Sequence, residues 1–483
     1  MNEPLWLGLD LGTGSAKAAI VSPAGTVLAE ASAGYEVLSR APGWAETEPV
    51  SWWQAVCRCT RELPAPLRAR VPSIGLSGQM HGVVLTAVDG QAVRPALLWP
   101  DQRAGAELGA YHDVHRERLA NPLTPGMMGP LLLWLARHEP GALARARWAL
   151  LPKDWLRWQM VGTAASDPSD VSGSLLSTPD GEWDMDLICD LGLGPHLFPP
   201  VRASADAAGT LRRDAADALG LPAGVTVATG AADTAAAAFG SGLVEPGMAQ
   251  LSVGSGAQII VMQRDCPAKT PQLNAYRAVV GAGGPGWYVM AAMQNAGTAL
   301  EWVRALFDLS WEQFHEQAFG VDRRLSQALF LPYLNGERTP WMDAQARGAW
   351  VGLARSDDRP RLLHAALRGV AFALRAGLDV LRGGGHAVTA LRLAGGGAAH
   401  PAWRQLLADV LGCPLWPSEV PNASARGAAL LGALAAGLLD PAALPPVAAL
   451  SGPVVQPAPD HQADHEADYA RFRASYLALH PIR

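Results

Sequence analysis

The sequence predicts an α/β protein made of two related domains that face a central cleft. At 483 residues, the chain is longer than one hydrophobic core usually supports, so we expect two domains of similar size. An apolar strand, a glycine turn and a second apolar strand open the chain, and the same pattern returns at residues 248–262. A strand, a glycine-rich turn and a helix are predicted at residues 225–240 and again at 390–412. This duplication at long period indicates one copy of each pattern in each half of the chain.

The first elements are predicted from apolar runs and the turn residues between them. Residues 5–10 form a strand that ends at a glycine turn, and residues 18–29 form two strands joined by a tight turn. A helix begins near residue 48, with Ser51 as its expected N-cap. A short strand then ends in a loop within residues 73–82.

The boundary between the two domains is predicted at residues 240–247, which are rich in glycine and proline. We therefore place the first domain at residues 1–243 and the second at residues 244–483. The longest uncharged apolar tract, residues 427–439, is expected to form a buried helix of the second domain. It is too short to span a bilayer, which takes ~20 residues.

Composition limits the partners of the protein. The chain has 38 basic and 44 acidic residues, a formal charge of −6, and no basic block, which argues against nucleic acid or an anionic membrane as a main partner. No basic segment precedes the first apolar run, so no signal peptide is expected. The five cysteines show no metal-like spacing and predict reduced thiols in the cytoplasm.

Two glycine turns are candidates for binding phosphate. They are Gly12-Thr13-Gly14 and Gly254-Ser255-Gly256, and each offers backbone N–H groups and one hydroxyl. The first turn is neither a P-loop nor a dinucleotide fingerprint, because the required spacings are absent. Two readings stay open: the glycines only make hairpins, or the two turns face each other and hold a phosphate chain. Lys17 either neutralises phosphate or lies in solvent.

Two carboxylates follow strands at glycine turns, which suggests a metal ligand and a base. Asp10 is placed to bind Mg²⁺, which prefers carboxylate and water oxygens shared with phosphates. Its alternative role is that of a turn-forming acid. Asp233 is placed to act as a general base towards a substrate hydroxyl, and its alternative role is a helix cap.

The loop that carries Gln79, Met80 and His81 is suited to recognising hydroxyl groups, because it joins two polar side chains to a thioether after a strand. The alternative is that His81 is an ordinary loop histidine without a ligand.

Taken together, several segments resemble the FGGY carbohydrate kinases and, within them, the xylulokinases. The segments, in family order, are Gly8 to Thr13, Gly43 to Glu46 with Trp52 and Trp53, Ser77 to Gly82, Leu98 to Arg103, Leu151 to Trp155, Ala165 to Asp167, Asp233, Leu331 to Pro340, and Gly395 to Ala398. Together they cover nearly the whole chain.

This resemblance implies two actin-like, ribonuclease H-like ATPase domains that close over MgATP and a sugar. It makes Asp233 the catalytic base and Asp10 the residue that serves the Mg²⁺ and the phosphates. The sugar site would comprise Gln79, Met80, His81, Asp101, Asp233 and Thr234. The phosphate and nucleotide site would comprise Asp10, Gly254, Ser255, Gly256, Gly297, Gly396 and Gly397, and we add Thr13, Gly14 and Lys17 from the first glycine turn.

The implied reaction is transfer of the γ-phosphoryl group of ATP to D-xylulose, giving D-xylulose 5-phosphate. Thr234 stands where relatives often have asparagine, and Pro100 also departs from the usual pattern, so the choice of sugar stays open. The alternatives are a kinase for ribulose, gluconate or glycerol, and a non-catalytic actin-like sugar sensor. A homodimer is left open.

Overall fold

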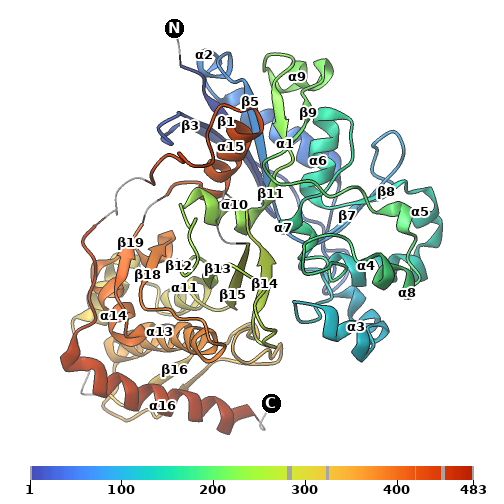
Figure 1. The fold of residues 1–483 in the computed structure, drawn as a ribbon. Coiled ribbons are helices and arrows are strands. Elements are labelled where there is room, and N and C mark those ends of the chain that lie inside the picture. Colours follow the sequence, from blue (N-terminus) through green and yellow to red (C-terminus); the bar gives the residue numbers. More distant parts are fainter. Residues whose placement is uncertain (1–2, 280–285, 322–325, 419, 448–451, 481–483) are drawn as a thin grey trace.

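The structure of the chain is a computed structural model that describes residues 3–279, 286–321, 326–418, 420–447 and 452–480. Figure 1 shows two lobes, one built mainly from the first half of the chain and the other mainly from the second half. Each lobe contains one large mixed β-sheet with helices packed on it. The predicted two-domain α/β fold is confirmed.

The first sheet begins with three antiparallel strands, continues with parallel ones and ends with an antiparallel edge strand. Its strands are β1 (Trp6–Leu11), β2 (Ser15–Val21), β3 (Val27–Gly34), β5 (Ser73–Gly78), β9 (Ala207–Thr210), β10 (Thr226–Ala228) and β11 (Ala231–Ala232). Their order is β3-β2-β1-β5-β10-β9, and β11 pairs with β5. Strand β5 is buried at every residue, as expected of a central parallel strand, whereas the edge strand β3 is largely open to solvent. The strands predicted at residues 5–10 and 18–29 are confirmed.

The second sheet repeats this plan. Its strands are β12 (Ala249–Val253), β13 (Ala257–Gln263), β14 (Asn274–Arg277), β15 (Trp287–Met293), β18 (Leu391–Ala394) and β19 (Leu415–Pro417). Their order is β14-β15-β13-β12-β18-β19. Strands β12, β13 and β15 are antiparallel neighbours, and β12, β18 and β19 are parallel. The internal duplication predicted from the sequence therefore appears as two sheets of matching topology.

The first lobe has helices on its sheet and a further group of helices with a separate hydrophobic core. The helices are α1 (Pro49–Glu62), α2 (Ala65–Arg68), α3 (Asp113–Arg118), α4 (Met128–His138), α5 (Pro140–Arg145), α6 (Pro152–Val161), α7 (Pro168–Val171), α8 (Met185–Asp190), α9 (Arg213–Leu219) and α10 (Asp233–Gly240). The further group lies around α4, α5 and α8. Short 3₁₀ helices lie at η1 (Arg103–Ala110) and η2 (Pro195–Leu197), and two small sheets pair β4 (Glu46–Thr47) with β7 (Ala96–Leu97) and β6 (Val84–Thr86) with β8 (Trp148–Leu150).

Helix α1 packs on the first sheet through an apolar stripe, with Trp52, Val56 and Cys59 fully buried. The expected helix is present, but Ser51 as its N-cap is wrong. Glu48 precedes the helix and Pro49 is its first residue, a position where the missing N–H of proline costs nothing. The hydroxyl of Ser51 lies inside the first turn and donates to the Glu48 carbonyl at 2.7 Å.

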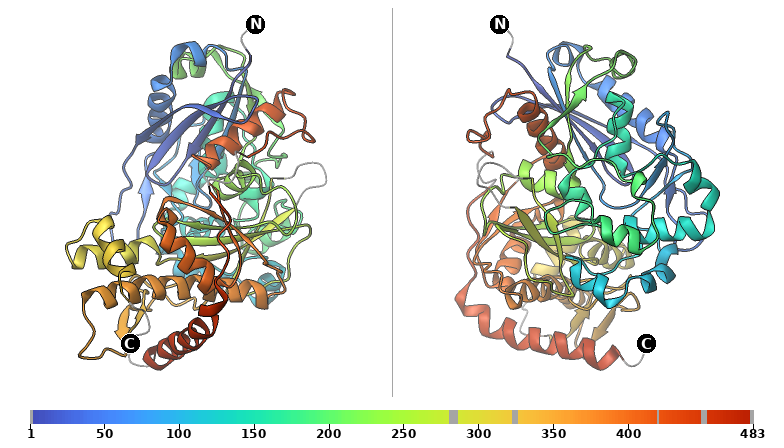
Figure 2. Two further views of the ribbon diagram at one scale, coloured as in Figure 1. Left: turned by 90° about the vertical axis from the view of Figure 1, so that its left-hand side faces the viewer. Right: turned by 45° about the vertical axis from the view of Figure 1, so that its right-hand side comes forward.

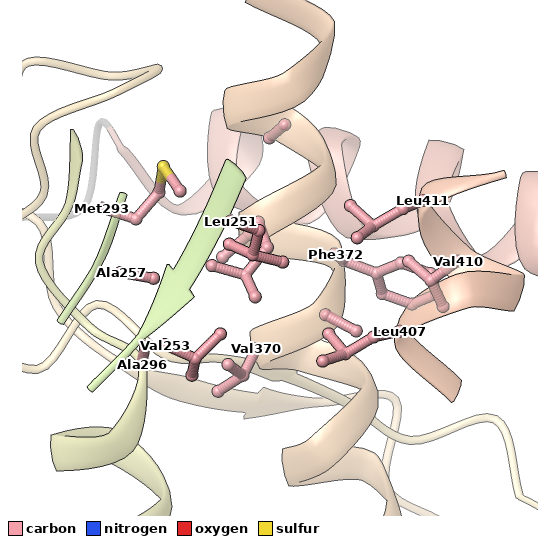
Figure 3. Packing of buried hydrophobic residues seen from close by; sticks show 14 of the residues in the cluster. Leu251, Val253, Ala257, Met293, Ala296, Val370, Phe372, Leu407, Val410 and Leu411 are labelled. Atoms are coloured by element: carbon pink, nitrogen blue, oxygen red, sulfur yellow. The ribbon is translucent and has the colours of Figure 1, made fainter. Parts of the chain in front are cut away.

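The second lobe has longer helices. They are α11 (Gly297–Leu306), α12 (Trp311–Phe319), α13 (Arg359–Gly383), α14 (Pro401–Leu411), α15 (Ala423–Ala435) and α16 (Gln462–Leu479), with short 3₁₀ helices η4 (Gly396–Ala398) and η5 (Pro459–His461) and a small sheet of β16 (Leu329–Leu331) and β17 (Ala349–Val351). Figure 3 shows how Leu251 and Val253 of β12 meet Val370 of α13, while Leu407 of α14 packs from the other side of that helix. Among the described residues, no helix is long and apolar enough to cross a membrane.

Helix α15 leaves its own half of the chain and packs on β1 and β5 of the first sheet. Both views of Figure 2 show this red-orange helix beside the blue strands. Two sheet glycines make room for it. A Cβ atom on Gly8 would overlap the carbonyl oxygen of Ala425, and one on Gly75 would overlap that of Ala428. The buried helix predicted at residues 427–439 is present but runs four residues earlier, from Ala423 to Ala435, so the last four residues of the prediction are not helical. This helix joins the two lobes.

Helices α10 and α15 cross with their backbones in contact. A Cβ atom on Gly240 of α10 would overlap the Ala423 carbonyl, and one on Gly427 of α15 would overlap the Ala236 carbonyl. Phe239 of α10 belongs to the same buried cluster as Ile260 of β13 and Met290 of β15. Each lobe therefore lends a helix to the boundary between the two sheets.

We predict that Gly427→Ala lowers the free energy of unfolding by roughly 1–3 kcal/mol, the usual cost of forcing a methyl group into a packed interior. Denaturant unfolding measures this change. The control is Gly383→Ala at the end of α13, where an added Cβ meets nothing within 4 Å. Equal stability of the two variants would contradict the close crossing of α10 and α15.

Candidate active site

The carboxyl ends of three neighbouring strands bring two acids together. Strand β5 runs parallel to both β1 and β11, and Ser77 of β5 pairs with Asp10 on one side and Ala231 on the other. Asp233 follows Ala231 by two residues and opens α10. Both acids therefore lie at the same edge of the first sheet, the edge where open α/β sheets bind their ligands.

Asp233 is partly buried and has one carboxylate oxygen engaged locally. Its Oδ1 accepts hydrogen bonds from the backbone N–H of Thr234 at 2.5 Å and from the Thr234 hydroxyl at 3.1 Å. Burial, and then the negative charge of Asp10, raise the pKa of Asp233 to about 7. A carboxylate with such a pKa is suited to accepting a proton near neutral pH.

Asp10 accepts a hydrogen bond from the Ser77 hydroxyl and faces Lys17 across the first hairpin. Burial raises its pKa, against the opposing effects of the Ser77 hydrogen bond and the Lys17 charge. The charge of Asp10 raises the pKa of Asp233, and two acids at one edge of the sheet make that edge favourable for a cation. Among the described residues there is no group of three or more histidine, cysteine, aspartate or glutamate side chains that would hold a metal. A single carboxylate such as that of Asp10 is compatible with Mg²⁺, which is often bound through one or two carboxylates together with water and phosphate oxygens.

The turn after β1 is open to a ligand. Gly14 is exposed, and a Cβ placed on it would meet nothing within 4 Å. Thr13 accepts a hydrogen bond at 2.9 Å from the indole N–H of Trp99. This bond ties the turn to the segment that carries Trp99.

The loop after β5 presents unused polar groups. The side chain of Gln79 is only 1% exposed, and neither its amide nitrogen nor its oxygen has a hydrogen-bond partner in the described part of the chain. Buried amides are normally bonded, so this side chain is poised for a ligand.

His81 is held in one orientation by strained backbone and one hydrogen bond. Its φ of 65° lies in the left-handed region, which costs free energy for a residue other than glycine. Its Nδ1 lies 2.7 Å from the Gly173 carbonyl, and burial lowers the pKa of His81 to about 4. The ring is therefore neutral near pH 7, with Nδ1 donating to that carbonyl and Nε2 left as an acceptor.

The second lobe contributes residues that the sequence did not single out for this site. The Tyr288 hydroxyl lies 3.7 Å from the Met80 sulfur, and the Tyr276 ring lies 5.8 Å from the His81 ring. The guanidinium of Arg338 lies 5.4 Å from the centre of the Trp99 ring. Trp99 and Arg338 both fall in segments that resemble the family, so the sequence could have indicated them as site residues. No feature of the sequence indicated Tyr276.

Asp101 differs from the other predicted sugar ligands, because its carboxylate is already engaged. It is fully buried and accepts hydrogen bonds from the Ala45 N–H at 2.7 Å and from the Arg103 guanidinium at 2.8–3.0 Å. Arg103 also pairs with Glu46 at 2.9 Å. These bonds order the segment that follows Trp99, and a direct contact of Asp101 with sugar stays a prediction.

The glycines predicted to hold nucleotide meet at the corresponding edge of the second sheet. Strands β12 and β18 run parallel and end side by side, at Gly254 and at the exposed Gly396 and Gly397. Gly297 opens α11 and donates its N–H to the Gly254 carbonyl at 3.0 Å, while the Thr298 N–H donates to the Ser255 carbonyl at 2.9 Å. These bonds use the first two N–H groups of α11 and fix the start of that helix against the exposed turn after β12.

Comparison with known proteins identifies this arrangement. Residues 5–240 match the N-terminal domain of the FGGY family of carbohydrate kinases, and residues 249–436 match the C-terminal domain of that family. The chain belongs to the FGGY carbohydrate kinases. It is therefore a phosphotransferase that acts on a sugar hydroxyl.

Three FGGY kinases illustrate the similarity. The xylulose kinase of Klebsiella pneumoniae is 34% identical over 417 residues, which are 85% of this chain and 86% of that protein. The crystal structure of a xyloylose kinase from Brucella ovis is 34% identical with a TM-score of 0.91 and covers 99% of this chain and 100% of that one. That of xylulose kinase from Rhodospirillum rubrum is 30% identical with a TM-score of 0.89 and covers 99% of both chains.

We predict that Asp233→Asn raises the thermal stability of this FGGY kinase, and more at pH 8 than at pH 5. The folded-state pKa of about 7 lies above the ordinary value of 3.8, so the stability that this group contributes is present at low pH and lost as pH rises through 7. Asparagine avoids the ionisation. Differential scanning fluorimetry at the two pH values measures the shift, which we expect to be roughly 2–4 °C at pH 8.

Asp217→Asn on the exposed face of α9 is the control, and it should leave the pH dependence of melting unchanged. A lower melting temperature of Asp233→Asn at pH 8 would show that the carboxylate of Asp233 is not a destabilising buried charge.

Proposed function

We propose that this FGGY kinase transfers the γ-phosphoryl group of ATP to the terminal hydroxyl of D-xylulose, forming D-xylulose 5-phosphate and ADP. The observation that carries the proposal is the carboxylate of Asp233, with its pKa raised to about 7, at the same sheet edge as Asp10 and the unpartnered amide of Gln79. The names of the relatives, which include xylulose kinases at 34% identity, support the choice of sugar.

The sugar would lie against the loop after β5. The Gln79 amide can both donate to and accept from its hydroxyl groups, and His81 Nε2 can accept one more. Met80 supplies an apolar contact and is itself held by Tyr288. Thr234 and Asp101 complete the proposed sugar site, Thr234 through its hydroxyl beside Asp233.

Asp233 would take the proton of the attacking hydroxyl. The hydroxyl oxygen forms a bond to the γ-phosphorus, the bond from that phosphorus to the β,γ-bridging oxygen breaks, and the proton moves to the free Oδ2 of Asp233. Its Oδ1 stays bonded to Thr234, which keeps the carboxylate in one orientation. Because phosphoryl transfer depends chiefly on alignment and charge neutralisation, the base supplies only part of the acceleration.

The nucleotide would be held from both lobes. We assign the phosphates to the turn of Thr13 and Gly14 with Lys17, and to the second-lobe residues Gly254, Ser255, Gly256, Gly297, Gly396 and Gly397. Asp10 would hold Mg²⁺, which when bound neutralises phosphate charge. The exposed Arg338 adds a positive charge near Trp99.

We further propose that the units 1–243 and 244–483 act as the two halves of this site and close on the sugar, which would exclude water from the phosphoryl group. The five cysteines are free thiols, which supports a cytoplasmic setting. A homodimer stays a prediction.

A panel of sugars tests the substrate. We expect ADP release in a coupled assay to be stimulated most by D-xylulose, with kcat/KM at least roughly tenfold above that for D-ribulose, D-gluconate and glycerol, since one well-placed polar contact discriminates by about that factor or more. A higher kcat/KM for another member of the panel would reassign the substrate. ATP binding without sugar-stimulated ADP release would favour a non-catalytic sensor.

We predict that Asp233→Ala lowers kcat by about 10²–10⁴-fold, the usual contribution of general-base catalysis, while the Kd for ATP stays within about twofold. The wild-type kcat/KM should rise with pH and level off above pH 7, because only the ionised carboxylate accepts a proton and its pKa is about 7. Steady-state kinetics between pH 5 and 9 and calorimetric ATP titration measure both. Near-normal turnover of Asp233→Ala would refute the assignment.

A further inference from the structure

A cluster of buried charges lies beside the turn that leads into Asp233, and the proposed reaction does not use it. The ammonium of Lys153 lies 2.5 Å from Asp154 Oδ1, 3.1 Å from Asp167 Oδ1 and 3.3 Å from Asp170 Oδ2, and all of these side chains are fully buried. The backbone of Lys153 adjoins β5, because a Cβ on Gly78 would lie 2.9 Å from the Lys153 Cβ. Buried ions destabilise a protein unless they are paired and hydrogen-bonded. The hydrogen bonds of these side chains therefore show which parts of the structure the cluster holds in place.

One chain of hydrogen bonds runs from this cluster to the residue before Asp233. The backbone N–H of Ala232 donates to the hydroxyl oxygen of Ser169 at 2.9 Å, and that hydroxyl donates to Asp167 Oδ2 at 2.6 Å. The same oxygen of Asp167 accepts from the Ser169 N–H at 3.0 Å and the Ser204 hydroxyl at 2.8 Å. Its other oxygen faces Lys153.

A second chain holds the other end of the turn. Arg157 donates to the Thr229 carbonyl at 2.5 Å and to Asp154 Oδ1 at 3.0 Å. Between the two attachment points, Gly230 has a φ of 87°, and a Cβ on it would lie 2.5 Å from the Leu76 carbonyl oxygen. The turn from Thr229 to Ala232 is therefore fixed at both ends by the charged cluster and along its side by β5.

Opposite charges lie together in this cluster. Although burial opposes ionisation of Asp154, the charges of Lys153 and Arg157 hold its pKa below the ordinary value. Burial raises the pKa of Asp170 well above its ordinary value, against the charge of Lys153. Asp167 is held towards Ser169 by the hydroxyl hydrogen bond on one oxygen and by the Lys153 ammonium on the other.

We propose that Ser169, oriented by Asp167 and the buried Lys153, is a positioning residue that aims the carboxylate of Asp233 at the acceptor hydroxyl. This inference rests on the proposed role of Asp233 as base. Ser169 accepts a hydrogen bond from the backbone N–H of Ala232, one residue before Asp233. Any displacement of that peptide would therefore move Asp233, the first residue of α10. Substrate-binding groups on the loop after β5 do not depend on this hydrogen bond.

The test is Ser169→Ala in the full chain, with Ser174→Ala as matched control. Ser174 is equally buried, donates to the Val171 carbonyl at 2.6 Å and accepts from the Leu176 N–H at 3.0 Å, but has no bond to the Asp233 turn. We expect Ser169→Ala to lower kcat by about 10- to 100-fold, as small misplacements of reacting groups do. The KM for D-xylulose and the Kd for ATP should stay within about threefold of wild type. Ser174→Ala should lower the melting temperature by a similar amount and retain wild-type kcat.

Equal kcat of the two serine variants would overturn the proposal and leave a structural role only. Asp233→Asn in the same assay separates this inference from the proposed function. If Asp233→Asn keeps its turnover, the assignment of the base fails. If Asp233→Asn loses its turnover but Ser169→Ala keeps the wild-type kcat, only the positioning role fails.

Should Ser169→Ala not fold, Ser204→Ala removes one donor from the same oxygen of Asp167. A smaller loss of kcat, about threefold or more, is then expected, and wild-type kcat would overturn the proposal.

Discussion

The backbone contact between α10 and α15 is the constraint on which the rest of this structure depends. Side chains normally keep helix axes 8–10 Å apart, but Gly240 and Gly427 remove that spacing where the helices cross. Gly8 and Gly75 do the same where α15 lies on the first sheet. The two lobes are therefore joined through contacts between backbone atoms, and no side-chain rotation can relieve a clash there.

This constraint sets the position of the chemistry. Asp233 is the first residue of α10, and its carbonyl oxygen lies 3.4 Å from the Ser424 hydroxyl at the start of α15. The N-terminus of α10 is thus held by the crossing on one side and by the Ser169 hydrogen bond on the other. A partly buried acid of raised pKa costs stability, and the packing on both sides of Asp233 allows the protein to keep it there.

Much of this was predictable from local sequence, and the part that was not depends on distant pairings. The glycine turns and the apolar strands before them predicted Asp10 and Asp233, because a turn at a strand end needs the same residues in any context. The apolar tract at residues 427–439 predicted a buried helix but not that it covers the first sheet, since that contact joins Gly8 to Ala425. Arg338 and Tyr276 reach the site from the second lobe. That the buried Gln79 amide has no hydrogen-bond partner in the described part of the chain can be recognised only from the structure, because it depends on which atoms surround the side chain.

A crystal structure of the enzyme with Mg²⁺, D-xylulose and a non-hydrolysable ATP analogue would test the role of Asp233 as base. We expect Asp233 Oδ2 at hydrogen-bond distance, ~3 Å, from the terminal sugar hydroxyl. The hydroxyl oxygen should lie in line with the γ-phosphorus, and Asp10 should lie on the metal side of the phosphates. A complex in which the Asp233 carboxylate points away from both the hydroxyl and the γ-phosphate, while sugar and nucleotide are fully bound, would contradict that role.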